Sequence, residues 1–184
     1  MAYLGTEDNG MGTTIPLDMD SYVILTVGSI RNIKRFHLVA EMLCLANLRI
    51  KWVHFGSIQN NDPTVARFKS AIAKLGEKRN IVLDFREDTF NKDILDYYRL
   101  NFIDLIINSG ESEGGAPVSI QEAISFRIPC LAATVGGNID IVKEEVGWLV
   151  DQDFDPERTI KALELCLVKE TREISRRKST REFW

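Results

Sequence analysis

The chain has few of the residues that build metal sites and disulfide frameworks. Its 184 residues include two histidines and three cysteines, and neither the C-x-x-C nor the H-E-x-x-H spacing occurs. The cysteines are odd in number, far apart and surrounded by apolar residues, which is typical of small buried side chains in a reducing compartment. These absences disfavour a protein-built zinc or iron site and a disulfide-stabilised secreted domain.

Long apolar runs and an excess of positive charge are also missing. The most apolar stretches, such as 22–27 and 105–107, are far shorter than the roughly 20 residues of a membrane helix, and residues 1–12 lack the pattern of a signal peptide. With 23 basic and 27 acidic residues, the net charge is −4, so little would drive binding to a polyanion. We therefore expect a cytoplasmic protein that binds no nucleic acid.

The composition, 45% hydrophobic and 27% charged, is typical of one globular domain. Along the chain, the sequence pattern predicts strands that alternate with helices. Apolar, β-branched runs predict strands, and 3.6-residue periodicity predicts the helices between them. This alternation predicts a Rossmann-like, three-layer α/β/α domain with a mainly parallel sheet of about six strands. The expected strands are 22–27, 50–55, 80–85, 104–108, 130–133 and 148–150, and the expected helices are 36–43, 64–75, 92–100, 118–126, 139–144 and 155–168.

The loop after the expected strand 104–108 has the features of a phosphate site. Gly114 and Gly115 would let the backbone approach a ligand closely. Pro117 suits the first turn of the following helix, where free amides form the positive end of the helix dipole and favour an anion. Those amides belong to Val118, Ser119 and Ile120. The alternative is an ordinary turn that starts a helix.

Two acidic residues flank this helix start. Glu122 lies four residues after Val118 on the same helix face, where its carboxylate could accept hydrogen bonds from both hydroxyls of a ribose whose phosphate rests on the helix end. Taken singly, Glu122 is better explained as an ordinary helix-surface acid and Glu113 as a solvated loop charge. Their joint position at a strand end favours a ligand site.

Two further glycine loops are expected at the same edge of the sheet. Gly136 and Gly137 follow the strand at 130–133, and Gly28 follows the first strand, with Lys34 six residues later. Lys34 can neutralise a diphosphate, although it and Arg31 also fit the pattern of surface side chains near a helix start. The P-loop, G-x-G-x-x-G and G-x-S-x-G patterns are absent, which disfavours P-loop NTPases, dinucleotide oxidoreductases and serine hydrolases.

Six stretches together carry a family resemblance that spans about residues 22–168. They read V-G-S-I-R-N-I-K-R at 27–35, K-W-V-H-F-G at 51–56, D-I-L-D-Y-Y at 93–98, S-E-G-G-A-P-V-S-I-Q-E-A-I-S-F-R-I-P at 112–129, A-T-V-G-G at 133–137 and G-W-L-V at 147–150. In these the chain resembles the carboxyl-terminal, donor-binding half of a GT-B retaining glycosyltransferase of family 4, as found in bacterial surface-polysaccharide synthesis.

The resemblance implies a role for each matching residue. Glu113 would lie near the donor sugar, Glu122 on the ribose and Lys34 at the diphosphate, which makes Glu113 and Lys34 the expected catalytic residues. Neither a metal nor another cofactor is implied, and base contacts are expected near Arg86. The implied nucleotide-sugar ligands are Gly28, Ser29, Arg31, Lys34, Arg86, Glu113, Gly114, Gly115, Pro117, Val118, Ser119, Glu122, Gly136 and Gly137.

Three positions depart from the family pattern. Eight residues separate Glu113 from Glu122 where seven are usual, which affects the position of Glu113 but not that of Glu122. Ser29 stands where the family often has arginine, with Arg31 as a substitute nearby. Arg127 replaces the usual glycine, a change that can alter the end of the preceding helix.

The resemblance also implies a missing half, because family members are about twice as long and carry an amino-terminal acceptor-binding domain. Residues 1–20 are then expected to be a linker from that domain, 21–168 the nucleotide-sugar-binding domain, and 169–184 a basic helical tail. The chain would be an incomplete fragment, inactive alone, whose glycan or lipid-linked acceptor is bound by the missing half. The alternatives are a non-catalytic nucleotide-sugar-binding module and an α/β scaffold for protein contacts.

The tail 169–184 contains six basic and three acidic residues. One interpretation is a solvated helix end. The other is peripheral contact with an anionic membrane surface on the inner face of the plasma membrane, where a lipid-linked acceptor would lie.

Overall fold

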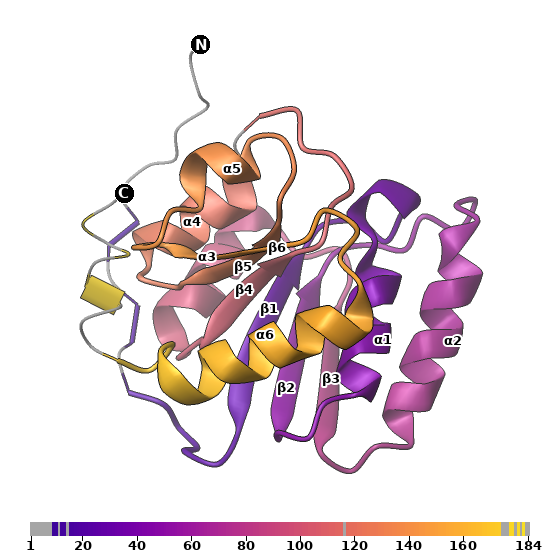
Figure 1. The fold of residues 1–184 in the computed structure, drawn as a ribbon, viewed down its shortest axis with the longest axis horizontal. Coiled ribbons are helices and arrows are strands. Elements are labelled where there is room, and N and C mark those ends of the chain that lie inside the picture. Colours follow the sequence, from indigo (N-terminus) through magenta and orange to yellow (C-terminus); the bar gives the residue numbers. More distant parts are fainter. Residues whose placement is uncertain are drawn as a thin grey trace.

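The computed structural model describes residues 9–10, 12–13, 15–115, 117–173, 177–178, 180 and 182. Strands alternate with helices along the whole domain, as the sequence predicts (Figure 1). The strands are β1 (Tyr22–Val27), β2 (Ile50–Phe55), β3 (Ile81–Arg86), β4 (Leu105–Asn108), β5 (Cys130–Ala133) and β6 (Gly147–Val150). The helices are α1 (Phe36–Cys44), α2 (Thr64–Gly76), α3 (Asn91–Leu100), α4 (Val118–Ser125), α5 (Asn138–Ile141) and α6 (Pro156–Lys169).

Two local details differ from the sequence prediction. The short helix expected at 139–144 is α5, which ends already at Ile141. A 3-10 turn, η1 (Asn32–Lys34), precedes α1 and was not predicted. One turn contains too few residues to show a helical periodicity, so the sequence pattern cannot reveal it.

The six strands form one sheet in the order β3-β2-β1-β4-β5-β6, and each neighbouring pair is parallel. This confirms the predicted parallel sheet. The chain runs outward in one direction from β1 through β2 to β3, and in the other from β4 through β5 to β6. The point where the strand order reverses therefore lies between β1 and β4, and in open α/β sheets ligands bind beyond the carboxyl ends of the strands at this point.

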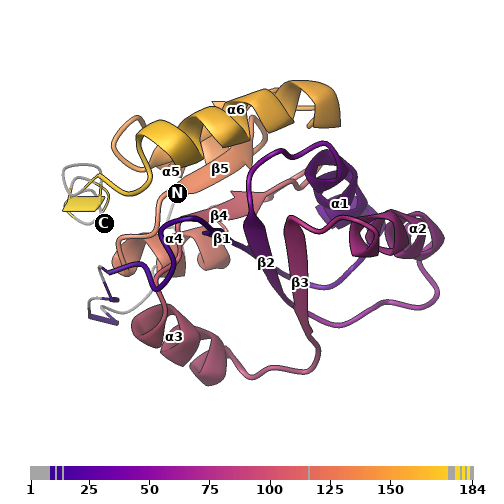
Figure 2. The same cartoon turned by 90° about the horizontal axis from the view of Figure 1, so that it is seen from below.

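Helices cover both faces of the sheet, which completes the predicted three layers. Apolar side chains of α1, α2 and α6 pack on one face, and those of α3, α4 and the end of α5 pack on the other. Figure 2 shows α1, α2 and α6 on one side of the strands and α3 on the opposite side. The central strands are buried on both faces, which explains why their sequences are continuous apolar runs rather than alternating ones.

Arg127 ends α4 in the way that a glycine would. Its φ is +66°, the left-handed conformation, and Ile128 N–H donates a hydrogen bond back to the Ala123 carbonyl at 3.0 Å. Helices commonly end on a left-handed residue that glycine occupies at least cost. The substitution therefore leaves the helix end unaltered, although the Arg127 Nε is buried without a hydrogen-bond partner in the described residues.

Two arginines of the basic tail pack into the domain. Arg172 Nε donates to Asp104 Oδ1 at 2.7 Å, and Asp104 is fully buried just before β4. Arg177 is buried as well, and it donates to the carbonyls of Thr171 and Ile103 at 2.8 and 2.7 Å. These two side chains are structural, so the interpretation as a solvated tail is wrong for them. Membrane contact by the remaining basic residues stays a prediction.

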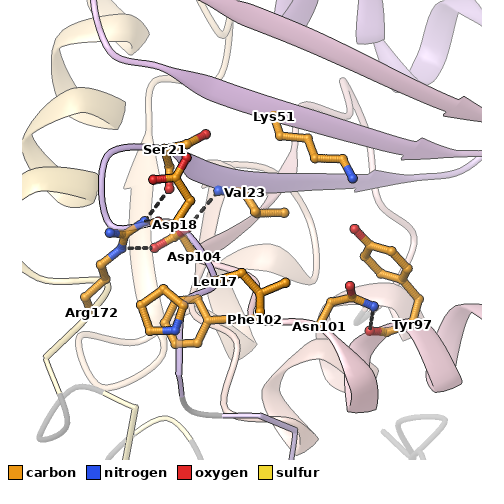
Figure 3. Close-up of a pocket in the computed structure, with 11 residues that line it drawn as sticks. Leu17, Asp18, Ser21, Val23, Lys51, Tyr97, Asn101, Phe102, Asp104 and Arg172 are labelled. Carbon is orange, nitrogen blue, oxygen red and sulfur yellow. Dashed lines mark hydrogen bonds and ion pairs between the residues drawn. The ribbon is translucent and has the colours of Figure 1, made fainter.

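A cavity of about 220 Å³ is lined on one side by the Arg172–Asp104 ion pair and on the other by Lys51 and Tyr97 (Figure 3). Val23 and Lys51 place it at the amino ends of β1 and β2, which is the opposite edge of the sheet from the loops singled out in the sequence.

No helix in the described part of the chain is long and apolar enough to cross a membrane.

Candidate functional site

The loops after β1, β4 and β5 meet at the carboxyl edge of the sheet, around the carboxylate of Glu113. Glu113 Oε1 accepts a hydrogen bond from Lys34 Nζ at 2.7 Å and another from Asn108 Nδ2 at 3.2 Å. The side chains of Lys34 and Glu113 are only 23% and 11% exposed. The two residues predicted to be catalytic are thus brought together, as a partly shielded ion pair, from positions 79 residues apart.

Lys34 is positioned by contacts between the first loop and the loop after β4. The carbonyl of Lys34 accepts a hydrogen bond from Ser109 Oγ at 2.7 Å. The next residue, Arg35, has a left-handed φ of +50°, and its guanidinium donates to the carbonyls of Ser109, Gly110 and Gln152 at 2.7, 2.8 and 2.8 Å. Arg35 therefore fastens the Lys34 turn to two other loops. Arg35 was not predicted as a site residue, because no local pattern distinguishes it from a surface arginine.

Gly136 allows the loop after β5 to approach Glu113. Its φ is +42°, and a Cβ at this position would lie 1.8 Å from the Glu113 carbonyl oxygen. The neighbouring Gly137 N–H points at the same oxygen, at 3.4 Å. Since any side chain at position 136 would collide with backbone, glycine is required there. This loop therefore holds the Glu113 backbone, and the predicted contact of Gly136 and Gly137 with the ligand stays a prediction.

Two asparagines that the sequence analysis missed link the same loops. Asn108 Oδ1 accepts from the Gly110 amide at 3.1 Å and from Asn138 Nδ2 at 3.4 Å, while Asn138 also donates to the Ala133 carbonyl at 2.9 Å. Both asparagines are buried. Their signal in the sequence is a polar residue at the end of a buried strand and another directly after a glycine pair.

The start of α4 differs in part from the predicted anion cradle. Pro117 is the residue before the helix, with an extended ψ of 124°, rather than its first residue. Its carbonyl accepts from the Ile120 amide at 3.1 Å, so Ile120 is not free as predicted. The amides of Val118 and Ser119 have no hydrogen-bond partner among the described residues. Within the described residues, two of the three expected donors are thus without a partner.

Gly114 and Gly115 have open space where a side chain would be, with no heavy atom within 4 Å of an added Cβ. Both are exposed. Packing within the chain therefore does not require glycine at either position, in contrast to Gly136.

Glu122 is buried between α4 and α3. Only 7% of the surface of Glu122 is exposed. Its Oε1 accepts a hydrogen bond at 2.9 Å from Nδ2 of Asn91, which is the first residue of α3. Burial raises the pKa of the Glu122 carboxyl above its ordinary value, and the hydrogen bond from Asn91 opposes that shift. Asn91 was not predicted, because the approach of the two helix starts is a tertiary feature.

Arg31 and Arg86 do not join the Lys34–Glu113 cluster. Arg31 is exposed, and its side chain makes no hydrogen bond or ion pair within the described residues. Arg86 forms an ion pair with Asp84 at 2.8 Å and lies over the ring of Tyr97, 4.6 Å from its centre. The hydrogen bond with Asp84 raises the pKa of Arg86. Its side chain is held at the end of β3, on the α3 face.

The arrangement offers an anion site beside acceptors for hydroxyl groups. The Lys34 ammonium and the amides of Val118 and Ser119, which have no partner among the described residues, provide positive charge and donors. The carboxylates of Glu113 and Glu122 can accept from sugar hydroxyls. Within the described residues, no group of three or more histidine, cysteine or acidic side chains could hold a metal ion. Metal-independent chemistry stays a prediction.

Comparison with known proteins shows the same fold in solved structures. The lipopolysaccharide outer core galactosyltransferase WaaB, in its apo form, matches with a TM-score of 0.73 at 16% identity, over 98% of this chain and 50% of that one. Anabaena HepE in complex with UDP matches with a TM-score of 0.71 at 14% identity, over 89% of this chain and 43% of that one. The chain thus spans half or less of the length of these two proteins. No match was found among curated proteins.

An isolated carboxyl-terminal domain also matches. The carboxyl-terminal domain of LpcC, a glycosyl transferase group 1 family protein from Francisella tularensis, has a TM-score of 0.71 at 16% identity, over 88% of this chain and 83% of that domain. This confirms the expected correspondence to a carboxyl-terminal half. The model of the family described as glycosyl transferases group 1 matches residues 14–182, which is most of the chain. The chain therefore belongs to the glycosyl transferases group 1 family.

Proposed function

We propose that this chain is the donor-binding domain of a retaining glycosyltransferase, which transfers a sugar from a nucleotide-diphosphate sugar to a glycan or lipid-linked acceptor. The observation that carries the proposal is the contact between Lys34 and Glu113 at 2.7 Å, which joins the loops after β1 and β4 at the point where the strand order reverses. Retention is proposed from the family resemblance. The HepE structures in complex with UDP and with UDP-glucose support a nucleotide-sugar donor.

In the proposed complex each part of the site takes one part of the donor. The diphosphate lies on the free amides of Val118 and Ser119 and is neutralised by Lys34. The exposed backbone at 114–115 lies against the donor, which explains two glycines that the chain's own packing does not require. Glu122 accepts the ribose hydroxyls and Glu113 contacts the sugar.

The chemical role of this arrangement is to stabilise the leaving group. When the bond between the sugar and the diphosphate breaks, negative charge builds up on the diphosphate. Lys34 and the helix amides are fixed donors at that position, so they need no reorganisation as the charge develops. This is the task that a divalent cation performs in other nucleotide enzymes, and we propose that no cation is needed here.

Nucleotide binding is the direct test of the proposal. Thermal-shift and calorimetric titrations of residues 1–184 with UDP, GDP, ADP and their sugars should identify one nucleotide that stabilises the chain. A ligand at about 100 times its dissociation constant raises the free energy of unfolding by roughly 2.7 kcal/mol. If none of these compounds bound in either assay, the proposed function would be wrong.

We further predict that residues 1–184 transfer no sugar on their own, whatever donor is offered. A donor domain without its acceptor half cannot align two substrates, and alignment supplies a large part of the rate enhancement of such reactions. A radiolabelled-donor assay with lipid-linked and soluble glycan acceptors measures this. Robust transfer by the isolated chain would contradict the two-domain proposal.

A non-catalytic nucleotide-sugar-binding module is the second candidate. Ser29, at a position where the family often has arginine, favours it. The two candidates differ when an amino-terminal acceptor domain is supplied. Donor binding without transfer by the two-domain protein would favour the binding module.

A further inference from the structure

His54 is a fully buried histidine that the proposed mechanism does not use. It is the fifth residue of β2, and its Nδ1 lies 2.7 Å from Thr26 Oγ1 on the neighbouring strand β1. Its ring stacks on Phe85 with centroids 5.0 Å apart. Its other nitrogen, Nε2, is buried without a hydrogen-bond partner in the described residues. A buried polar atom in that state calls for a physical explanation.

The hydrogen bonds around Thr26 determine which ring nitrogen of His54 carries the proton. Trp52 Nε1, which can only donate, lies 2.8 Å from Thr26 Oγ1. The Thr26 hydroxyl oxygen therefore accepts a hydrogen bond from Trp52. The hydroxyl hydrogen of Thr26 is then donated to Nδ1 of His54. Burial lowers the pKa of His54 to about 3, so the ring is neutral at physiological pH and its single proton lies on Nε2.

The Nε2–H group lies next to the carbonyl of Gly28. A Cβ placed on Gly56, at the end of β2, would be 3.2 Å from His54 Nε2 and 2.0 Å from the Gly28 carbonyl oxygen. Both atoms therefore crowd the same point beside Gly56. The Gly28 carbonyl favours a proton on the ring, which agrees with Nε2 as the protonated nitrogen. The glycine at 56, with a φ of +153°, leaves the room that this carbonyl occupies.

The direction of the Gly28 carbonyl fixes the direction of the next amide. The described chain has no cis peptide bond, and in a trans peptide the C=O and the following N–H point in opposite directions. Because the Gly28 carbonyl points toward β2, the Ser29 N–H points away from it, toward the side of β1 where β4 lies. That side holds the Lys34–Glu113 pair. The Ser29 amide has no hydrogen-bond partner among the described residues.

We propose that His54 is a positioning residue that orients the Gly28–Ser29 peptide, so that the Ser29 amide is presented to the diphosphate of the donor. If the peptide were flipped, the Gly28 carbonyl oxygen would face the same phosphates and repel them. The backbone on either side of this peptide is held to β2 by hydrogen bonds from Gly28 N–H to the Phe55 carbonyl and from Ile30 N–H to the Ser57 carbonyl, each at 2.8 Å. In the proposal, His54 adds to these bonds by favouring the Gly28 carbonyl on its own side of the peptide. This inference rests on the proposed function, and it assigns to Ser29 a backbone role that does not depend on the side chain found there.

The test compares His54→Phe with the parent chain by calorimetric titration with UDP, uridine and inorganic pyrophosphate. Phenylalanine keeps a ring against Phe85 and removes both nitrogens. A contribution the size of one hydrogen bond corresponds to about a 3- to 10-fold change in the dissociation constant. We expect His54→Phe to raise the dissociation constant by up to this factor for UDP and pyrophosphate but not for uridine. His54→Gln, which restores an N–H donor, should recover part of the loss. The matched control is His37→Phe, which changes a buried histidine on α1.

Amide NMR provides a readout that a purely structural role would not change. Pyrophosphate should shift the Ser29 amide resonance strongly in the parent chain and weakly in His54→Phe. Equal UDP and pyrophosphate affinities in a folded His54→Phe would overturn the inference while leaving the proposed function standing. If the parent chain binds neither UDP, GDP, ADP nor pyrophosphate, the proposed function itself fails, and the inference fails with it. Should His54→Phe not fold, Ser29→Pro removes the same N–H directly and must weaken pyrophosphate binding.

Discussion

Lys34→Ala should weaken binding of the nucleoside diphosphate by about 10- to 150-fold, while leaving binding of the corresponding nucleoside unchanged. The range corresponds to the roughly 1.5–3 kcal/mol that a hydrogen bond to a charged group contributes. The effect falls on the diphosphate alone because the Lys34 ammonium lies at the Glu113 carboxylate, beside the loops that carry the predicted phosphate donors, and not near Arg86 or β3. Calorimetric titration with the nucleoside and its diphosphate measures the difference.

The ion pair adds a second effect that has to be separated from the first. Without Lys34, the Glu113 carboxylate keeps, among the described residues, the hydrogen bond from Asn108 alone and would repel a phosphate. The double variant Lys34→Ala/Glu113→Gln removes that repulsion, and diphosphate affinity should stay low if the ammonium itself binds the ligand. Lys161→Ala, at an exposed lysine of α6, is the matched control. Full recovery of affinity in the double variant would return Lys34 to the role of a structural partner for Glu113.

Glu122→Gln should weaken nucleotide binding by roughly tenfold or more and at the same time raise the melting temperature of the unliganded chain at neutral pH. The loss follows from replacing a carboxylate that accepts charge-assisted hydrogen bonds from the ribose. The gain follows from the burial of Glu122, because a neutral amide avoids the cost of a buried charge and its oxygen still accepts from Asn91. In a domain of this size, about 1 kcal/mol corresponds to a rise of roughly 2–4 °C.

The pH dependence of that gain has a defined sign. The pKa of Glu122 is raised in the folded chain, so its contribution to stability is fully present below the ordinary glutamate pKa of about 4.3 and is lost as the pH rises through the folded value. The stability advantage of Glu122→Gln should therefore be absent near pH 4 and grow toward neutral pH. Glu77→Gln, at an exposed residue after α2, should show no such trend.

A second consequence concerns the ligand. Ribose hydroxyls hydrogen-bond the ionised carboxylate, so nucleotide affinity of the parent chain should fall as the pH drops through the raised pKa of Glu122. The affinity of Glu122→Gln should not fall in that range. Unchanged nucleotide affinity in the variant at neutral pH would contradict the assignment of Glu122 as the ribose ligand, and a lower melting temperature would show that burial of its charge is compensated within the chain.

The sequence by itself determined the fold class and the edge of the sheet where the site lies. Strands buried on both faces are apolar at most positions rather than at alternate ones, so runs such as 22–27 and 104–108 indicated a parallel sheet without any knowledge of strand order. The loops after such strands all reach one edge, which is why the glycine loops at 28, 114 and 136 could be grouped in advance. Family spacing then indicated Lys34, Glu113 and Glu122.

The tertiary structure alone decided which of these groups touch. Lys34 meets Glu113 because β1 and β4 are neighbours in the strand order, and the periodicity of a sequence does not contain that order. The contact between Asn91 and Glu122 also depends on the tertiary structure, because it forms only where the starts of α3 and α4 approach each other. The burial of Arg172 and Arg177 also required the fold, because a basic tail looks solvated until Asp104 and the backbone carbonyls that bind it are placed beside it. A side chain's partner is set by which strands pair across the sheet, whereas its local conformation is set by its neighbours along the chain.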